Sequence, residues 1–226
     1  MKKRIFYTEI SYIVGLLILA FGTALMERTD FGVSMVVAPA YILHLKISEF
    51  LPFFSFGMAE YTLQAVVLLL MMIILRRVKL SYFFSFVTAV LYGLLLDGSI
   101  AVVAFLPYGS LAWRLLFYAV GMLCSSTGVA LLFHTYISPE AYELFVKEIS
   151  TRFGFDIHKC KTLYDCASCL IAIVLSFAFF GWWHFEGIKL GTVFCAFLNG
   201  TLIRLFTKLL EKRWTFEDAL PLKKYF

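Results

Sequence analysis

The chain has 226 residues, of which 62% are hydrophobic and only 15% are charged, with a formal net charge of +5. A soluble domain is about a quarter charged, because charged side chains keep its surface in water. This composition therefore excludes a soluble globular protein. It predicts an all-α integral membrane protein with six transmembrane helices of about 20 residues each, and such a chain leaves no room for a separate enzyme domain.

The N-terminal segment Met1-Lys2-Lys3-Arg4 and the apolar run after it look like a signal peptide. No A-x-A-like cleavage site follows the run, which ends in Glu27-Arg28-Thr29-Asp30, so we expect a retained first helix. Six apolar stretches are long enough to cross a bilayer. They are residues 6–26, 52–75, 80–106, 111–133, 162–183 and 189–210.

Lysine and arginine residues indicate the orientation of these spans. When the N-terminus is placed in the cytoplasm, fifteen basic residues fall on the cytoplasmic side and four outside. The positive-inside rule therefore predicts that both termini are cytoplasmic, and we expect a bacterial-type inner membrane. Anionic lipid attracts such a basic face, so the net charge needs no nucleic acid partner. The fifteen residues on the cytoplasmic side are Lys2, Lys3, Arg4, Arg76, Arg77, Lys79, Lys147, Arg152, Lys159, Lys161, Lys208, Lys212, Arg213, Lys223 and Lys224. The four outside are Arg28, Lys46, Arg114 and Lys189, and Arg204 lies within the last span.

Two segments between the spans are too short or too amphipathic to cross a membrane. Residues 33–50 follow the turn Asp30-Phe31-Gly32, and residues 138–153 follow Tyr136-Ile137. Each segment either re-enters the bilayer, where it would line a central cavity, or lies on the membrane surface. The charged side chains of residues 138–153 favour the surface for that segment. The nearly uncharged residues 33–45 leave both interpretations open.

Short motifs recur in the same order in residues 1–106 and 107–226. Their order predicts two homologous three-helix halves in one membrane domain, with a short amphipathic or re-entrant helix in each half. Because three is odd, the second half would enter the membrane from the opposite side, which makes a 3+3 inverted repeat. Chance similarity among apolar helices is the alternative. The matches include Gly22-Thr23-Ala24-Leu25 with Gly128-Val129-Ala130-Leu131, Thr62-Leu63 with Thr162-Leu163, and Gly93 with Gly200.

Polar side chains inside apolar spans mark candidate sites, because a charged one costs about 2.5–3.5 kcal/mol at the bilayer centre. Helix starts with free N–H groups, as expected near Gly32 and Ser34, add anion-binding positions. We therefore expect a substrate-binding cavity formed by Gly32, Ser34, Glu60, Gln64, Asp97, Asn199 and Arg204. Snorkelling to the interface is the alternative for Arg204, and Asp165 is expected at an interface. Gly93 and Gly200 are predicted to let helices approach closely.

No pattern in the sequence indicates a metal, a cofactor or catalysis. Cys166-x-x-Cys169 has the spacing of a redox or metal motif, but no second cysteine or histidine pair completes a tetrahedral set. We interpret the five cysteines as packing residues. No nucleophile–base pair and no phosphate-binding glycine loop is present, so we expect no enzyme and no cofactor.

Several of these motifs resemble those of the YczE/YyaS/YitT-type bacterial membrane proteins. Asp30-Phe31-Gly32-Val33-Ser34 is similar to the stretch after their first helix, and Lys161-Thr162-Leu163-Tyr164-Asp165 to the Arg-Thr-x-x-Glu that opens their fifth. Gly93-Leu94-Leu95-Leu96-Asp97 and Gly187-Ile188-Lys189-Leu190-Gly191-Thr192 look like their third- and sixth-helix patterns. This chain lacks their Pro-Trp after Ser34. The resemblance implies a multi-pass inner-membrane protein, often suggested to be a transporter, and it supplies no substrate.

Three functions are compatible with these features. The first is a small-molecule transporter or permease with a central site between inverted halves. The second is a substrate-binding subunit of a larger importer, like the vitamin-binding S-components, which would dock a partner through the small face Ala20-x-x-x-Ala24. The third is an accessory or scaffold membrane protein that transports nothing. The expected partners are the lipid bilayer, an unidentified small-molecule ligand, and either a second copy of the chain or a partner membrane subunit.

Overall fold

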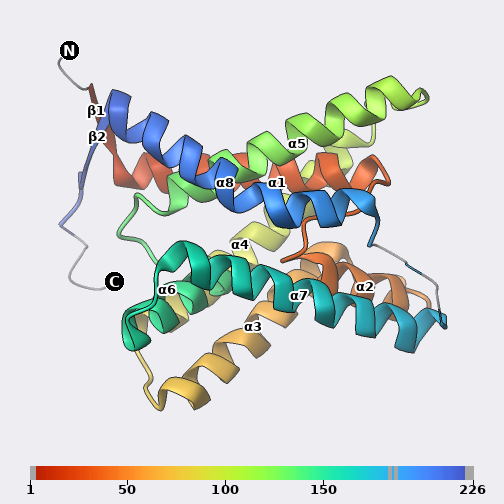
Figure 1. The fold of residues 1–226 in the computed structure, drawn as a ribbon, viewed down its shortest axis with the longest axis horizontal. Coiled ribbons are helices and arrows are strands. Elements are labelled where there is room, and N and C mark those ends of the chain that lie inside the picture. The colour runs from red at the N-terminus through yellow and green to blue at the C-terminus, as the bar shows by residue number, and fades with distance from the viewer. Residues whose placement is uncertain (1–3, 183–184, 186–187, 222–226) are drawn as a thin grey trace.

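The computed structural model describes residues 4–182, 185 and 188–221. Six of its helices are long and apolar enough to cross a membrane. They are α1 (Thr8–Arg28), α3 (Phe56–Leu75), α4 (Leu80–Val103), α5 (Leu111–Leu132), α7 (Ile157–Phe180) and α8 (Leu190–Arg213). The prediction of an all-α, six-helix membrane protein is confirmed. Both ends of the described chain lie at one end of the bundle, which we call the terminal end, opposite the far end (Figure 1).

Helix boundaries differ from the predicted spans mainly for the fifth, where α7 begins at Ile157, five residues before the apolar stretch. That first turn carries Lys159 and Lys161, which a hydropathy pattern excludes from a span. Several residues named above lie outside the described part of the chain: Met1, Lys2, Lys3, Gly187, Lys223 and Lys224, as does position 183 at the end of the fifth predicted span.

The short helix α6 (Ala141–Phe153) lies inside the bundle instead of on a membrane surface. At its start, the Ala141 N–H donates to Gln64 Oε1 at 2.9 Å, and Gln64 stands near the middle of α3. Near its end, Lys79 donates to both Glu148 oxygens at 2.6 and 2.8 Å, and Lys79 immediately precedes α4. Helix α6 therefore runs from mid-bundle to the terminal end. Two of the charges that favoured the surface interpretation, Glu143 and Glu148, are paired with lysines of neighbouring segments, whereas Lys147 and Arg152 are exposed.

The second short helix, α2 (Ala38–Ser48), runs the other way. The residues before it, Met35 and Val36, pack against Tyr142 of α6. Near its end, Lys46 Nζ lies 5.7 Å from the ring centroid of Phe180, the last residue of α7. Helix α2 therefore leads from mid-bundle to the far end, and the starts of α2 and α6 lie close together.

Glycines let α1 and α5 cross in close contact. A Cβ on Gly22 would lie 2.7 Å from the carbonyl oxygen of Gly121, and one on Gly121 would lie 2.8 Å from that of Gly22. Gly15 and Gly128 face each other in the same way. Backbone-to-backbone packing of this kind is typical of small residues in membrane helices. Since α1 and α5 belong to different sequence halves, residues 1–106 and 107–226 pack together along this crossing.

A short parallel strand pair joins the two ends of the chain. Strand β1 (Arg4–Tyr7) pairs with β2 (Trp214–Glu217), with Arg4 opposite Trp214. Glu9, in the first turn of α1, then accepts hydrogen bonds from the backbone N–H groups of Ala219 and Leu220 at 3.1 and 2.9 Å. The sequence analysis did not anticipate these strands.

Candidate functional site

Two acidic side chains and a glutamine form a hydrogen-bonded group at the centre of the bundle. Glu60 and Gln64 lie one turn apart on α3 and so share one face of the helix. Gln64 Nε2 lies 3.4 Å from Glu60 Oε2 and 3.1 Å from Glu140 Oε2, next to the start of α6. The Tyr142 hydroxyl donates to Glu60 Oε2 at 3.1 Å. The first turn of α6 is thus held against the middle of α3.

A buried ion triad adjoins this group. Lys161 Nζ lies 3.1 Å from Glu143 Oε1 and 3.0 Å from Asp165 Oδ1, and the three side chains are 6%, 5% and 2% exposed. Lys161 and Asp165 are one turn apart on α7, and Glu143 reaches them from α6. One ammonium group therefore serves two carboxylates.

We define the central cluster as Glu60, Glu140, Glu143, Lys161 and Asp165. This cluster has more acidic than basic side chains. Counted over the whole residue, backbone included, none of its members is more than 4% exposed. Four carboxylates and one ammonium give a formal charge of −3 when all are ionised. One oxygen each of Glu60 and Glu140 is buried and has no hydrogen-bond partner among the described residues. Because an unpaired buried carboxylate is costly, the cluster needs protons or a bound cation for balance.

A small cavity of about 30 Å³ lies beside the central cluster. Such a volume is close to what one water molecule occupies in the liquid. The cavity is reached by side chains from both halves of the sequence, which include Thr23, Ser34, Tyr92, Ser125, Glu140, Tyr142, Glu143, Lys161 and Asn199. Tyr92 donates to Thr23 at 3.0 Å, and Ser126 to Asn199 Oδ1 at 2.9 Å. The wall of this small cavity thus combines hydrogen-bonded polar side chains with apolar ones.

The structure brings together four of the seven residues predicted to form a cavity: Ser34, Glu60, Gln64 and Asn199. It places Asp97 at the far end, where its carboxylate accepts hydrogen bonds from Ser55 Oγ at 2.6 Å and from the Gly57 N–H at 2.9 Å. Asp97 therefore stabilises the start of α3, whose N-cap is Ser55.

Gly32 and Arg204 also lie away from the central cluster. Gly32 has φ = +97° in the turn after α1, and any Cβ there would overlap the Thr192 side chain at the start of α8. Arg204 is exposed and faces the start of α7. Neither residue lines the central cavity. Gly32 lies in the turn after α1, and Arg204 lies on the exposed surface of α8.

The two glycines predicted to pack helices have different surroundings. A Cβ on Gly93 would lie 2.7 Å from the carbonyl oxygen of Gly57, so α3 and α4 touch at this point. At Gly200 the nearest atom would be Thr162 Oγ1 at 3.7 Å, which is ordinary contact. Gly200 thus lies beside an opening between α7 and α8 and not at a tight crossing.

Sequence reasoning missed Glu140, Glu143 and Lys161 as site residues. It expected Asp165 near a membrane interface and did not foresee that this side chain is buried by protein, with the residue 1% exposed. The spacing carried a usable signal. Glu140 and Glu143 are three residues apart and Lys161 and Asp165 four apart, so each pair shares a helix face. Opposite charges on two such faces could have been matched with each other.

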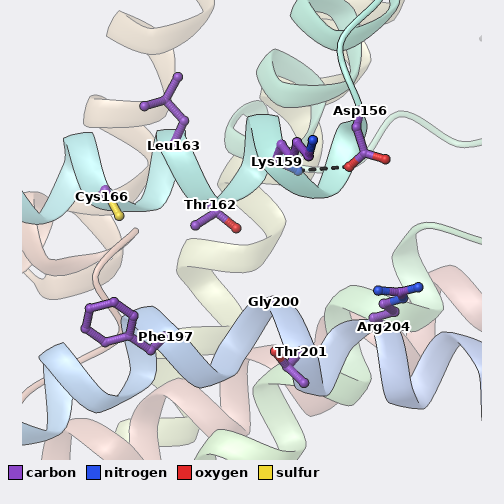
Figure 2. Close-up of a pocket in the computed structure, with 9 residues that line it drawn as sticks. All are labelled: Asp156, Lys159, Thr162, Leu163, Cys166, Phe197, Gly200, Thr201 and Arg204. Carbon is purple, nitrogen blue, oxygen red and sulfur yellow. Dashed lines mark hydrogen bonds between the residues drawn. The ribbon is translucent and has the colours of Figure 1, made fainter.

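A second, larger hollow is the open groove of about 680 Å³ between α7 and α8, shown in Figure 2. We call it the α7–α8 groove. It is lined by Asp156, Lys159, Thr162, Leu163, Cys166, Phe197, Gly200, Thr201 and Arg204. Among the described residues, no group of three or more histidine, cysteine or acidic side chains is arranged to hold a metal ion.

Comparison with known proteins gives one family. The chain has no match among the curated proteins, and none among the solved structures. A family model described as "Family of unknown function (DUF6198)" matches residues 6–208, which include all six long helices up to the last turns of α8. The chain therefore belongs to the DUF6198 family, whose function is unknown.

Proposed function

We propose that this protein is a small secondary transporter whose central cluster binds a cation between two inverted halves. The single observation that carries the proposal is the buried excess of carboxylates over ammonium groups at the meeting point of α2 and α6. Ionisable residues in membrane interiors typically mark ion or substrate pathways. A purely structural bundle would gain stability from apolar side chains at these positions.

The packing of α1 against α5 supports the inverted repeat. The motif match of Gly22 with Gly128 implies an offset of 106 residues, under which Gly15 matches Gly121. In the structure, Gly15 faces Gly128 and Gly22 faces Gly121. Gly15 thus faces the counterpart of Gly22, and Gly22 faces the counterpart of Gly15. A two-fold axis between equivalent surfaces produces this exchange of partners. Such an axis in the membrane plane is the hallmark of many secondary transporters.

The short helices agree with the same symmetry. Helix α2 follows α1 and runs from mid-bundle to the far end, and α6 follows α5 and runs from mid-bundle to the terminal end. Broken helices that begin near the membrane midplane commonly hold the binding site of a transporter. A central volume of about 30 Å³ suits a closed state that holds a single small ion.

Reconstitution in liposomes tests the proposal. We would measure charge movement on a solid-supported membrane after concentration jumps of protons, sodium, and small organic ammonium ions. We expect at least one of these cations to give a saturable current with the wild-type protein. Glu60→Gln and Glu143→Gln should each reduce the current at least tenfold, because each removes a negative charge from the central cluster.

Glu148→Gln is the matched control, because it makes the same substitution on the same helix as Glu143→Gln. Glu148 lies near the terminal end and outside the central cluster. It should keep more than half of the current. Equal currents in Glu60→Gln and the wild type would remove the central cluster from the mechanism. No current with any cation would favour an accessory protein, and co-purification with an ATPase would favour the importer-subunit hypothesis.

The resemblance to YczE/YyaS/YitT-type proteins remains a prediction, since the matched family does not carry those names. We also propose a bacterial-type inner membrane location with the terminal end in the cytoplasm. The positive-inside distribution of lysine and arginine supports this orientation.

A further inference from the structure

The α7–α8 groove has a polar end and an apolar end (Figure 2). The polar end is formed by Asp156, just before α7, by Lys159 on α7 and by Arg204 on α8. Cys166 and Phe197 stand at the apolar end. From Lys159 to Cys166 the groove follows seven residues of α7, or about 10 Å. A ligand that fits both ends is amphipathic.

The polar end carries unpaired positive charge. Neither Lys159 nor Arg204 forms an ion pair among the described residues, and both are exposed. The one acidic lining residue, Asp156, accepts a hydrogen bond from the Lys159 backbone N–H at 3.0 Å and so caps the start of α7. The helix N-terminus offsets its charge. The two side-chain cations are therefore left to attract an anion.

The groove opens on the side of the bundle that faces lipid. Leu163 and Phe197, on its two walls, are 72% and 75% exposed, which a membrane protein tolerates only against acyl chains or a partner. Lys159 lies in the first turn of α7, whose N-terminus faces the terminal end of the bundle. Basic pockets between membrane helices on the cytoplasmic side bind anionic headgroups.

We propose that the α7–α8 groove binds one anionic glycerophospholipid from the leaflet at the terminal end. Lys159 and Arg204 hold the phosphate from opposite walls, and the first part of one acyl chain lies along Leu163, Cys166 and Phe197. A zwitterionic lipid fits less well, because its cationic headgroup would meet the same two cations. This site is separate from the central cluster and does not depend on transport.

Native mass spectrometry of the detergent-purified protein tests the proposal. The protein would be equilibrated with equal amounts of phosphatidylglycerol and phosphatidylcholine before measurement. We expect one retained phosphatidylglycerol per chain. Arg204→Gln and Lys159→Gln should each lower its retention about fivefold, the effect of one basic side chain near an anionic lipid.

Two further variants separate this site from general basicity. Lys208→Gln removes a charge from α8 one turn beyond Arg204 and outside the groove, so it should change retention less than twofold. Gly200→Leu adds a side chain to the wall of the groove, at a position where a Cβ makes only ordinary contact, 3.7 Å from Thr162 Oγ1. It should lower retention at least as much as Arg204→Gln.

Three outcomes would overturn the proposal. Equal losses in Arg204→Gln and Lys208→Gln would mean that Arg204 merely reaches the interface. Equal retention of the two lipids would remove the charge argument. A disulfide-linked dimer formed through the exposed Cys166 would mean that a second copy of the chain covers the groove.

Discussion

Replacement of Lys161 by methionine is the most direct test of how the central cluster is balanced. Lys161 Nζ lies 3.1 Å from Glu143 and 3.0 Å from Asp165. At such distances and an effective dielectric constant near 20, each contact contributes about 5 kcal/mol of attraction before dehydration is counted. Loss of one partner from a buried ion pair typically costs about 3–5 kcal/mol, because the remaining charge is left uncompensated. Lys161→Met should therefore lower the melting temperature by about 6–20 °C.

A thiol-reactive dye reports this unfolding in detergent. Cys195 is 1% exposed and becomes reactive only when the bundle opens, whereas the exposed Cys166 gives a constant background. The triple variant Lys161→Met, Glu143→Gln and Asp165→Asn removes all three charges together. It should recover more than half of the lost stability, since replacement of a whole buried ion group is often neutral or stabilising.

An exposed ion pair provides the control for Lys161→Met. Lys46 and Glu49 lie 2.6 Å apart with side chains 30% and 45% exposed. Such pairs contribute at most about 1 kcal/mol, so Lys46→Met should lower the melting temperature by less than about 4 °C. The reasoning would be refuted by a Lys161→Met protein that melts within about 3 °C of the wild type. It would equally be refuted by a triple variant as unstable as the single one.

Three further outcomes are expected. Gly22→Leu should lower the free energy of unfolding by about 1–3 kcal/mol in the same melting assay, because a Cβ at this position would lie 2.6 Å from the Ser125 backbone nitrogen. Gly109→Leu is its control and should be nearly neutral, because Gly109 lies in a loop with open space around it. Asp97→Ala should cost about 1 kcal/mol and leave cation currents unchanged, because Asp97 supports the Ser55 cap and not the central cluster. A fluorescent protein fused to the C-terminus should fold and fluoresce in the bacterial cytoplasm, whereas an alkaline phosphatase fusion at that site should be inactive.

The spans were predictable because an uninterrupted apolar run of about 20 residues has few other uses in a protein. Helices α3, α4 and α5 begin or end within a few residues of the expected positions for this reason. Strands β1 and β2 were not predictable, since each has only four residues and pairs with a segment more than 200 positions away. Strand β2 alternates aromatic and polar residues, but four residues are too few to indicate a partner.

Of the five residues of the central cluster, only Glu60 was predicted from the sequence, together with its neighbour Gln64. Glu60 and Gln64 stand in an apolar helix, where their cost identifies them. Glu143 and Glu148 lie in a charged helix. Its sequence pattern fits a helix exposed to water as well as a helix whose charges pair with buried side chains. The choice depends on Lys161 and Lys79, which face α6 only once the helices are assembled. Asp97 was predicted to line the cavity but lies away from it. Its role at the start of α3 depends on Ser55, which is 42 residues earlier in the chain and gives no sign of this contact in the sequence.

The pairing of β1 with β2 has a consequence for biosynthesis. Strand β1 leaves the ribosome about 210 residues before strand β2, so it must wait for its partner until all the intervening helices have been inserted. A truncated product that ends before Trp214 would leave Arg4–Tyr7 without a partner strand and Glu9 without the backbone donors of Ala219 and Leu220. An unpaired strand of this kind at the membrane boundary would distinguish incomplete chains from finished ones.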